Sequence, residues 1–96
     1  MFAVFLTFSE NKARAGEFMA GHNDWLARGF DDGVFLLSGS LKPGIGGAIL
    51  ADGLSREALE ARLADDPFVA ETVVRAEIHE ISPGRADSRL GFLLGS

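Results

Sequence analysis

Few side chains in this 96-residue sequence are suited to proton transfer near neutral pH. It contains two histidines, His22 and His79, and no cysteine, so imidazole is the side chain whose ordinary titration range fits. His22 falls among apolar residues that recur every three or four positions, which is the spacing of one helix face. An imidazole on such a face either packs as a core residue or transfers protons, and the residues alone leave both roles open.

A carboxylate occurs at a second position with a recognisable local role. Asp66 precedes Pro67, which is the pattern of a helix N-cap followed by proline at the first helical position. Capping of this kind stabilises a protein by about 1 kcal/mol. The neighbouring Asp65 has no such signal, and we expect it to be solvated.

Other polar and aromatic residues could each have a structural role or a role in ligand binding. Ser38 and Ser40, separated by Gly39, are either ordinary strand-end residues or line a cleft with their hydroxyls. A nucleophilic serine is disfavoured, because no base is assured within reach of either hydroxyl. Trp25 is typical of a core or interface anchor rather than a surface on which a ligand stacks. We expect His79 at the surface or at a dimer edge.

The sequence disfavours metal, phosphate and nucleic-acid sites. The two histidines are far apart in sequence and lack metal-ligand spacing, and the glycine-rich segment 44–47 is not followed by the lysine of a phosphate loop. The net charge is −5, and the nine lysines and arginines are scattered. We therefore expect no metal, no cofactor and no nucleic-acid partner.

Hydrophobic periodicity predicts the elements that must position these residues. Strands are expected over 2–8, 34–40, 46–51 and 72–81, a long helix from a cap at Ser9 or Asn11 to about Arg28, a second helix over 55–64, and a short helical turn over 67–70. The order β-α-β-β-α-β is the ferredoxin-like α+β pattern, with a four-stranded antiparallel sheet and the helices on one face. The length predicts a single domain, 1–96.

Helices on one face leave the other face of the sheet uncovered. The first strand is largely apolar on both faces, and strict alternation places Phe35 and Leu37 on one face of the second strand, opposite Leu36. Ser38 and Ser40 fall on the Leu36 side. A second copy of the chain is the simplest cover for the open face, so we expect a homodimer.

The C-terminal segment 85–96 differs in character from the rest of the chain. Leu90, Phe92, Leu93 and Leu94 follow a polar stretch. Each of these side chains would forgo about 1.5–3 kcal/mol of burial if it were left in water. We therefore predict that this tail packs on its own core or, more favourably, on the partner subunit.

Two further features of the sequence bear on where in the cell the protein is located. The absence of cysteine fits a reducing cytoplasm. The apolar opening 1–8 lacks the basic residues of a signal peptide and is far shorter than the ~20 residues that span a bilayer. It is better interpreted as a buried strand, and a cytoplasmic protein without a membrane partner is expected.

Several motifs in order resemble the YciI-like family of the dimeric α+β barrel superfamily over about residues 1–82. They are His22-Asn-Asp-Trp25-Leu26, Gly33-Val-Phe-Leu-Leu-Ser-Gly39, Gly46-Gly47-Ala, Ser55-Arg-Glu-Ala-Leu and Asp65-Asp66-Pro67-Phe68-Val69. The resemblance implies a homodimer with a cleft in each subunit. It also implies that the family's proposed pair, a helix histidine and the aspartate of the Asp-Pro-aromatic turn, is His22 and Asp66. Many relatives carry proline where this chain has Ser40, so the rim of the cleft is expected to differ.

This resemblance implies a cofactor-free enzyme, of lyase or isomerase type, that performs general acid/base chemistry on a small oxygenated or anionic molecule. His22 would be the acid/base, and Asp66 would fix its tautomer while still capping its helix. The expected ligand-contacting residues are Ser38, Gly39, Ser40 and Trp25. The alternative is a non-catalytic dimer that binds a small molecule, and the superfamily fold also supports cofactor-free oxygenases. A catalytic histidine would have Asp66 within hydrogen-bond reach and space beside its ring.

Overall fold

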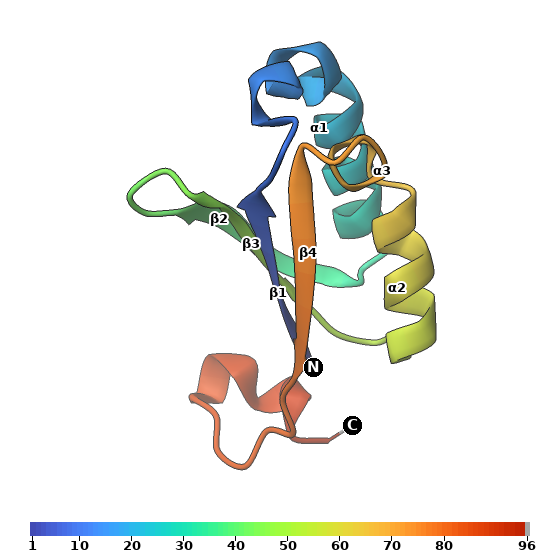
Figure 1. Cartoon of the computed structure of the whole chain (residues 1–96). Helices are drawn as coiled ribbons and strands as arrows, with labels where there is room; N and C mark the ends of the chain where they lie inside the picture. The colour runs from blue at the N-terminus through green and yellow to red at the C-terminus, as the bar shows by residue number, and fades with distance from the viewer. Residues whose placement is uncertain (96) are drawn as a thin grey trace.

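The computed structural model describes residues 1–95 and has a four-stranded antiparallel sheet covered on one face by helices (Figure 1). The strand order is β2-β3-β1-β4, so the predicted ferredoxin-like α+β fold is confirmed. Among these residues, no helix is both long and apolar enough to cross a membrane. The elements are β1 (Phe2–Phe8), η1 (Lys12–Arg14), α1 (Ala15–Asp31), β2 (Phe35–Leu41), β3 (Gly46–Ala51), α2 (Arg56–Ala64), α3 (Pro67–Ala70), β4 (Val74–Glu80) and η2 (Ser88–Leu93).

The long helix α1 begins and ends later than predicted. One 3₁₀ turn, Lys12–Arg14, precedes it, and the α-helix then continues past Arg28 to Asp31. Asn11 does not cap the turn with its side chain. Its Nδ2 instead donates a hydrogen bond of 2.8 Å to the backbone oxygen of Glu71. The polar residue that suggested a helix start therefore ties this segment to the loop that leads into β4.

Each of the two shorter helices begins at a capping side chain. The Ser55 hydroxyl accepts a hydrogen bond of 3.0 Å from the backbone N–H of Ala58 at the start of α2. Asp66 Oδ1 likewise accepts from the backbone N–H of Phe68 at 3.0 Å, and Pro67 is the first residue of α3. These local signals fix where the chain turns back toward the sheet.

The hydrophobic core lies between the helices and the sheet. Its largest enclosed apolar side chains include Trp25 from α1, Ile49 from β3 and Leu59 from α2. The indole Nε1 of Trp25 donates a 2.8 Å hydrogen bond to the backbone oxygen of Arg62, which links α1 to α2. Trp25 is therefore a core anchor, as its residue type suggested.

A β-bulge in β2 overturns the predicted alternation of that strand. The register with β3 shifts between Phe35 and Leu37, so that Phe35 is buried under α1 whereas Leu37 is 53% exposed. Phe35 pairs with Ala51 and Ser38 pairs with Ile49, two positions that share one face of β3. The prediction that Phe35 lies opposite Ser38 is wrong, because one extra residue reverses the side on which every later side chain points.

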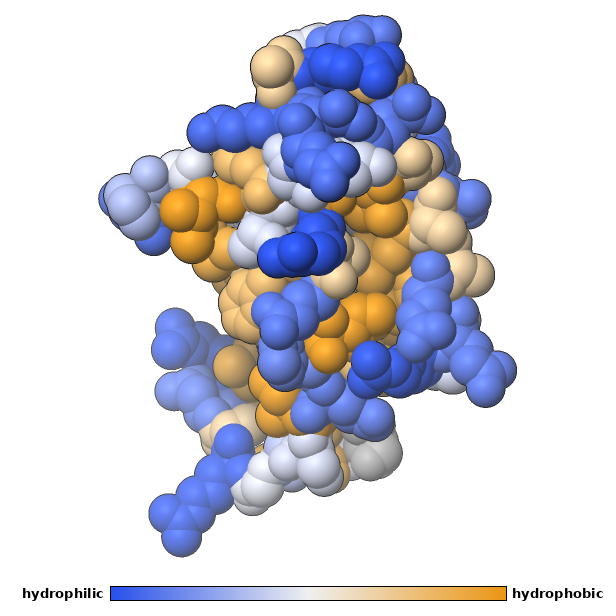
Figure 2. All heavy atoms as spheres, in the orientation of Figure 1, coloured by the Kyte–Doolittle hydropathy of each residue, from blue (hydrophilic) through white to orange (hydrophobic). Residues whose placement is uncertain are grey.

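The face of the sheet opposite the helices is less apolar than predicted, because Phe35 does not belong to it. Phe5 lies on this face, with its ring centroid 5.8 Å from that of His79 on β4. Figure 2 shows hydrophobic side chains at the surface of the β2–β3 hairpin and between the edge strand β4 and the helices. The sheet thus retains apolar surface that this chain does not cover.

The C-terminal segment turns away from the helical layer (Figure 1). Within it Leu93 is buried, whereas Leu90, Phe92 and Leu94 remain about half exposed. One of the four apolar side chains of the tail, Leu93, is therefore buried against its own subunit. Packing of the other three on a partner stays a prediction.

The contact between Gly29 and Phe35 gives a test of the packing between α1 and β2. A Cβ added at Gly29 would lie 2.0 Å from the Phe35 ring, so Gly29→Ala should destabilise the protein by about 1–3 kcal/mol. The control is Gly16→Ala on the same helix, where an added Cβ meets nothing within 4 Å. That change should be neutral or stabilising by up to about 1 kcal/mol. Urea unfolding measures both, and equal stability of the two variants would contradict this packing.

Candidate functional site

His22, on α1, and Asp66, at the start of α3, form a hydrogen-bonded pair. The Nδ1 atom of His22 lies 2.8 Å from Oδ1 of Asp66, although the two residues are 44 positions apart. The Asp66 side chain is completely buried, and the His22 side chain is 12% exposed. One nitrogen of the imidazole is thus held by a buried carboxylate, while another part of the His22 side chain remains accessible to solvent.

A close approach of two helices makes this pair possible. Gly21, the residue before His22, faces Pro67 at the start of α3, and an added Cβ would lie 3.0 Å from the proline Cγ. A larger residue would push α3 outward. The small residue on α1 and the proline on α3 therefore bring Asp66 within reach of the imidazole.

Two aromatic rings restrict the orientation of His22. The Phe68 ring is stacked on the imidazole, with the centroids 4.1 Å apart and the planes 7° from parallel. Trp25, one turn further along α1, is stacked more loosely at 5.9 Å and 25°. Together with the bond to Asp66, these contacts leave the ring little freedom to turn.

The Asp66 carboxylate uses its two oxygens unequally. Oδ1 accepts the capping bond from the Phe68 N–H and also faces His22 Nδ1. Oδ2 is buried and has no hydrogen-bond partner within residues 1–95. One oxygen thus serves both the helix cap and the imidazole. A buried oxygen without a partner is unfavourable, so this arrangement is not optimised for stability alone.

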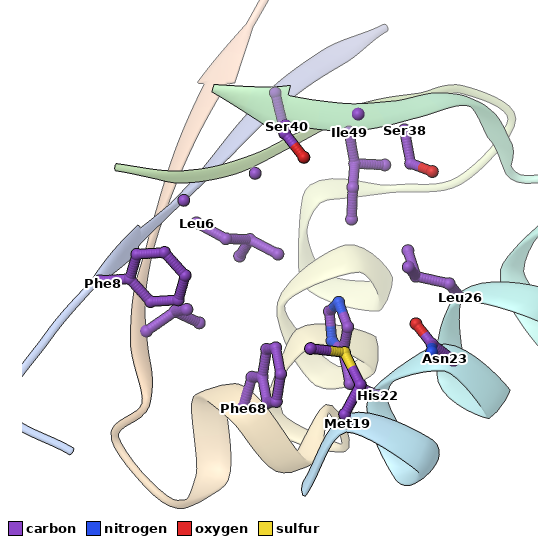
Figure 3. Close-up of a pocket in the computed structure, with 15 residues that line it drawn as sticks. Leu6, Phe8, Met19, His22, Asn23, Leu26, Ser38, Ser40, Ile49 and Phe68 are labelled. Carbon is purple, nitrogen blue, oxygen red and sulfur yellow. The ribbon is translucent and has the colours of Figure 1, made fainter. Parts of the chain in front are cut away.

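A cleft of about 300 Å³ opens beside His22, between α1 and the sheet (Figure 3). Its polar lining includes His22, Ser38 and Ser40, and Gly39 lies between the two serines. The imidazole therefore has space beside it and is not enclosed as a core residue would be. The apolar part of the lining includes Leu6, Phe8, Met19, Leu26, Ile49 and Phe68.

The structure separates Trp25 from the other predicted site residues. Ser38, Gly39 and Ser40 line the cleft, and Asp66 lies behind His22. Trp25 is only 2% exposed and is not part of the cleft lining, so its assignment as a ligand-contacting residue is not supported. Its role is to pack behind the imidazole.

Residues that the sequence reasoning missed also line the cleft. Asn23, directly after His22, adds an amide at the α1 side, and Met19 lies one turn before it. Met19 precedes His22 by three residues and so shares its helix face, which was the available signal, whereas the position of Asn23 directly after His22 gave none. On the sheet side, Gly46 has a φ of 146°, and an added Cβ would collide with the backbone oxygen of Leu6. Glycine is thus required where β3 begins, beside β1.

The second histidine takes no part in this site. His79 lies on the opposite face of the sheet, and its Nε2 is 3.4 Å from a carboxylate oxygen of Glu77. Within residues 1–95 no group of three or more histidine, aspartate or glutamate side chains is arranged to hold a metal ion.

Known proteins resemble this chain in sequence and in fold. Residues 1–82 match the family model of the YCII-related domain, whereas no curated protein sequence matches. A similar solved structure is the 5-chloro-2-hydroxyhydroquinone dehydrochlorinase from Burkholderia phenoliruptrix in complex with 2,5-dihydroxybenzoquinone. It shares 12% identity at a TM-score of 0.69, over 88% of this chain and 96% of that one, and so shows the fold alone. Because the family model covers most of the sequence, the chain belongs to the YCII-related domain family.

Proposed function

We propose that the chain is a cofactor-independent enzyme that transfers protons on a small oxygenated organic molecule, with His22 as general acid/base and Asp66 as its positioning partner. The observation that carries this proposal is the hydrogen bond between the buried Asp66 and an imidazole that borders an open cleft. A buried carboxylate on one nitrogen is the arrangement that orients a histidine for proton transfer at the other.

The proposed mechanism follows from the atoms of the pair. An ionised carboxylate only accepts hydrogen bonds, so the proton between the two groups resides on Nδ1 of His22. The Nε2 lone pair is then available to remove a proton from a ligand in the cleft. The electrons left behind form a new double bond as a leaving group departs, and the imidazolium returns its proton to the leaving group or to water. The charge of Asp66 stabilises the imidazolium in the interval.

The similarity to a dehydrochlorinase supports an elimination of this kind. Loss of hydrogen chloride from an oxygenated ring requires removal of a proton and departure of chloride, and a single well-placed base suffices for the first step. The cleft lining has that single base, His22. A non-catalytic binding protein would use the same cleft with His22 only as a hydrogen-bond partner, and the variants below distinguish the two.

The same family membership and the uncovered sheet support a homodimer as the functional unit. Phe5 and Leu37 lie on the face without helices, and Phe92 of the tail is 56% exposed. A two-fold axis would bury these surfaces in both copies at once. We therefore place the partner subunit against the open face and the tail.

Substitution of His22 separates catalysis from packing. His22→Gln keeps similar bulk and some hydrogen bonding, and should leave the melting temperature nearly unchanged while it lowers turnover by about a hundredfold or more. Asp66→Asn should act in the same direction but less severely, since asparagine still caps α3. Thermal-shift screening of small oxygenated molecules, followed by chloride release from chlorinated hydroquinones, supplies the assay.

The matched control is His79→Gln, which removes the histidine on the other sheet face and should preserve turnover as long as light scattering shows the same oligomeric state. If His22→Gln binds and converts the same compounds as the unaltered protein, the enzyme proposal fails. If it loses stability by roughly 1–3 kcal/mol and binding falls only as far as folding does, His22 is a packing residue.

The tail gives a test of the dimer. Deletion of residues 88–96 should lower the melting temperature or weaken a dimer seen by light scattering at micromolar concentration, because it removes apolar surface. Two point variants refine the test. Leu93→Ala should destabilise the fold because Leu93 is buried, whereas Phe92→Ser should affect only association. A monomeric protein, or a deletion with unchanged mass and melting curve, would contradict this proposal.

A further inference from the structure

We propose that Asn23, Ser38 and Ser40 act as a polar clamp that orients the ligand against His22 and restricts the cleft to uncharged ligands. This inference rests on the proposed function, since it assigns the positioning residues and the charge of the ligand for the same cleft. None of the three residues contacts Asp66 in a hydrogen bond, so the clamp is separate from the proton-transfer pair.

The β-bulge in β2 is what aims the clamp at the cleft. After the bulge, Ser38 pairs with Ile49 and Ser40 pairs with Gly47, so both serines lie on the face of the sheet that looks toward α1. Residues two apart on a strand are separated by about 7 Å, so the two hydroxyls can hold two different oxygen atoms of one ligand. Figure 3 shows Ser40 projecting from the sheet into the cleft, with Asn23 and His22 on the opposite, helical side.

The three side chains are available to a ligand. Within residues 1–95, no hydrogen bond engages the Asn23 amide or the hydroxyls of Ser38 and Ser40. The walls around them are apolar, and include Leu6, Leu26 and Ile49. A few unpaired polar groups in an apolar cleft determine which ligand orientation is accepted. An amide and two hydroxyls each donate and accept, so they match carbonyl and hydroxyl groups.

The described lining carries no fixed charge, and His22 is its one titratable side chain. In the described part of the chain, no aspartate, glutamate, lysine or arginine lines the cleft. Lys12 reaches the neighbourhood, with its Nζ 4.9 Å from the ring centroid of Phe8, but it is not part of the lining. A carboxylate or phosphate that entered would lose water without gaining a fixed cation. The expected ligand is therefore a neutral ring or chain that carries two or more oxygens.

Binding of two matched probes tests the clamp. Hydroquinone is uncharged at neutral pH, and 2,5-dihydroxybenzoate presents the same two hydroxyls beside a carboxylate. In calorimetric titrations, hydroquinone should bind the unaltered protein at least about tenfold more tightly than the benzoate, since an unpaired ion is costly to desolvate. Asn23→Ala and the double variant Ser38→Ala/Ser40→Ala should each weaken hydroquinone binding by roughly 3- to 30-fold, as expected for one or two lost hydrogen bonds.

Controls isolate the clamp from general effects. Asp24→Ala, on the exposed side of α1, and Ser82→Ala, beyond β4, should bind hydroquinone as the unaltered protein does. His22→Gln should still bind it within a few-fold while losing turnover, so that loss of catalysis without loss of binding concerns the proposed function only. Clamp variants that bind normally would overturn the clamp and leave the acid/base pair standing.

Two further outcomes would also overturn the inference. One is equal or tighter binding of 2,5-dihydroxybenzoate, with Lys12→Met weakening it, which would make this an anion site. The other is failure of the unaltered protein to bind hydroquinone at millimolar concentration. In either case the uncharged polar lining would not determine the ligand.

Discussion

The hydrogen bond between His22 and the buried Asp66 is the contact on which the rest of the site depends. It joins α1 to the start of α3 and so couples two segments that the sequence keeps 44 residues apart. The same oxygen of Asp66 caps α3, so the helix end and the imidazole share one acceptor. Any shift of α3 would therefore move the catalytic candidate, and the Gly21–Pro67 contact holds the two helices at the required distance.

The cost of this arrangement is visible in the other carboxylate oxygen. Oδ2 of Asp66 is enclosed without a hydrogen-bond partner among the described residues, although an apolar side chain there would avoid that penalty. Buried ionisable groups of this kind concentrate at functional sites. The proposed acid/base role thus accounts for a feature that packing alone would not select, and the apolar cleft beside it would hold the ligand that this role requires.

Local sequence signals predicted most of the fold, whereas features that depend on contacts between distant segments were harder to predict. The caps at Ser55 and Asp66 could be identified because each acts on residues two or three positions away. The bulge in β2 could not, since one extra residue in a strand leaves the composition unchanged while it reverses the face that Phe35 occupies. The pairing of His22 with Asp66 came from the family resemblance, because neither residue's local pattern points to the other.

The tautomer of His22, meaning which ring nitrogen carries the proton in the neutral imidazole, tests this account most directly. Long-range ¹H–¹⁵N correlation spectra at neutral to mildly alkaline pH distinguish the two neutral imidazole tautomers, and His79, which has no buried carboxylate partner among the described residues, gives a second histidine signal in the same sample for comparison. If Asp66 holds the ring as described, His22 should populate the Nδ1–H form alone, and Asp66→Asn should change that population. A mixture of the two tautomers at His22, or a spectrum that Asp66→Asn leaves unaltered, would contradict the account.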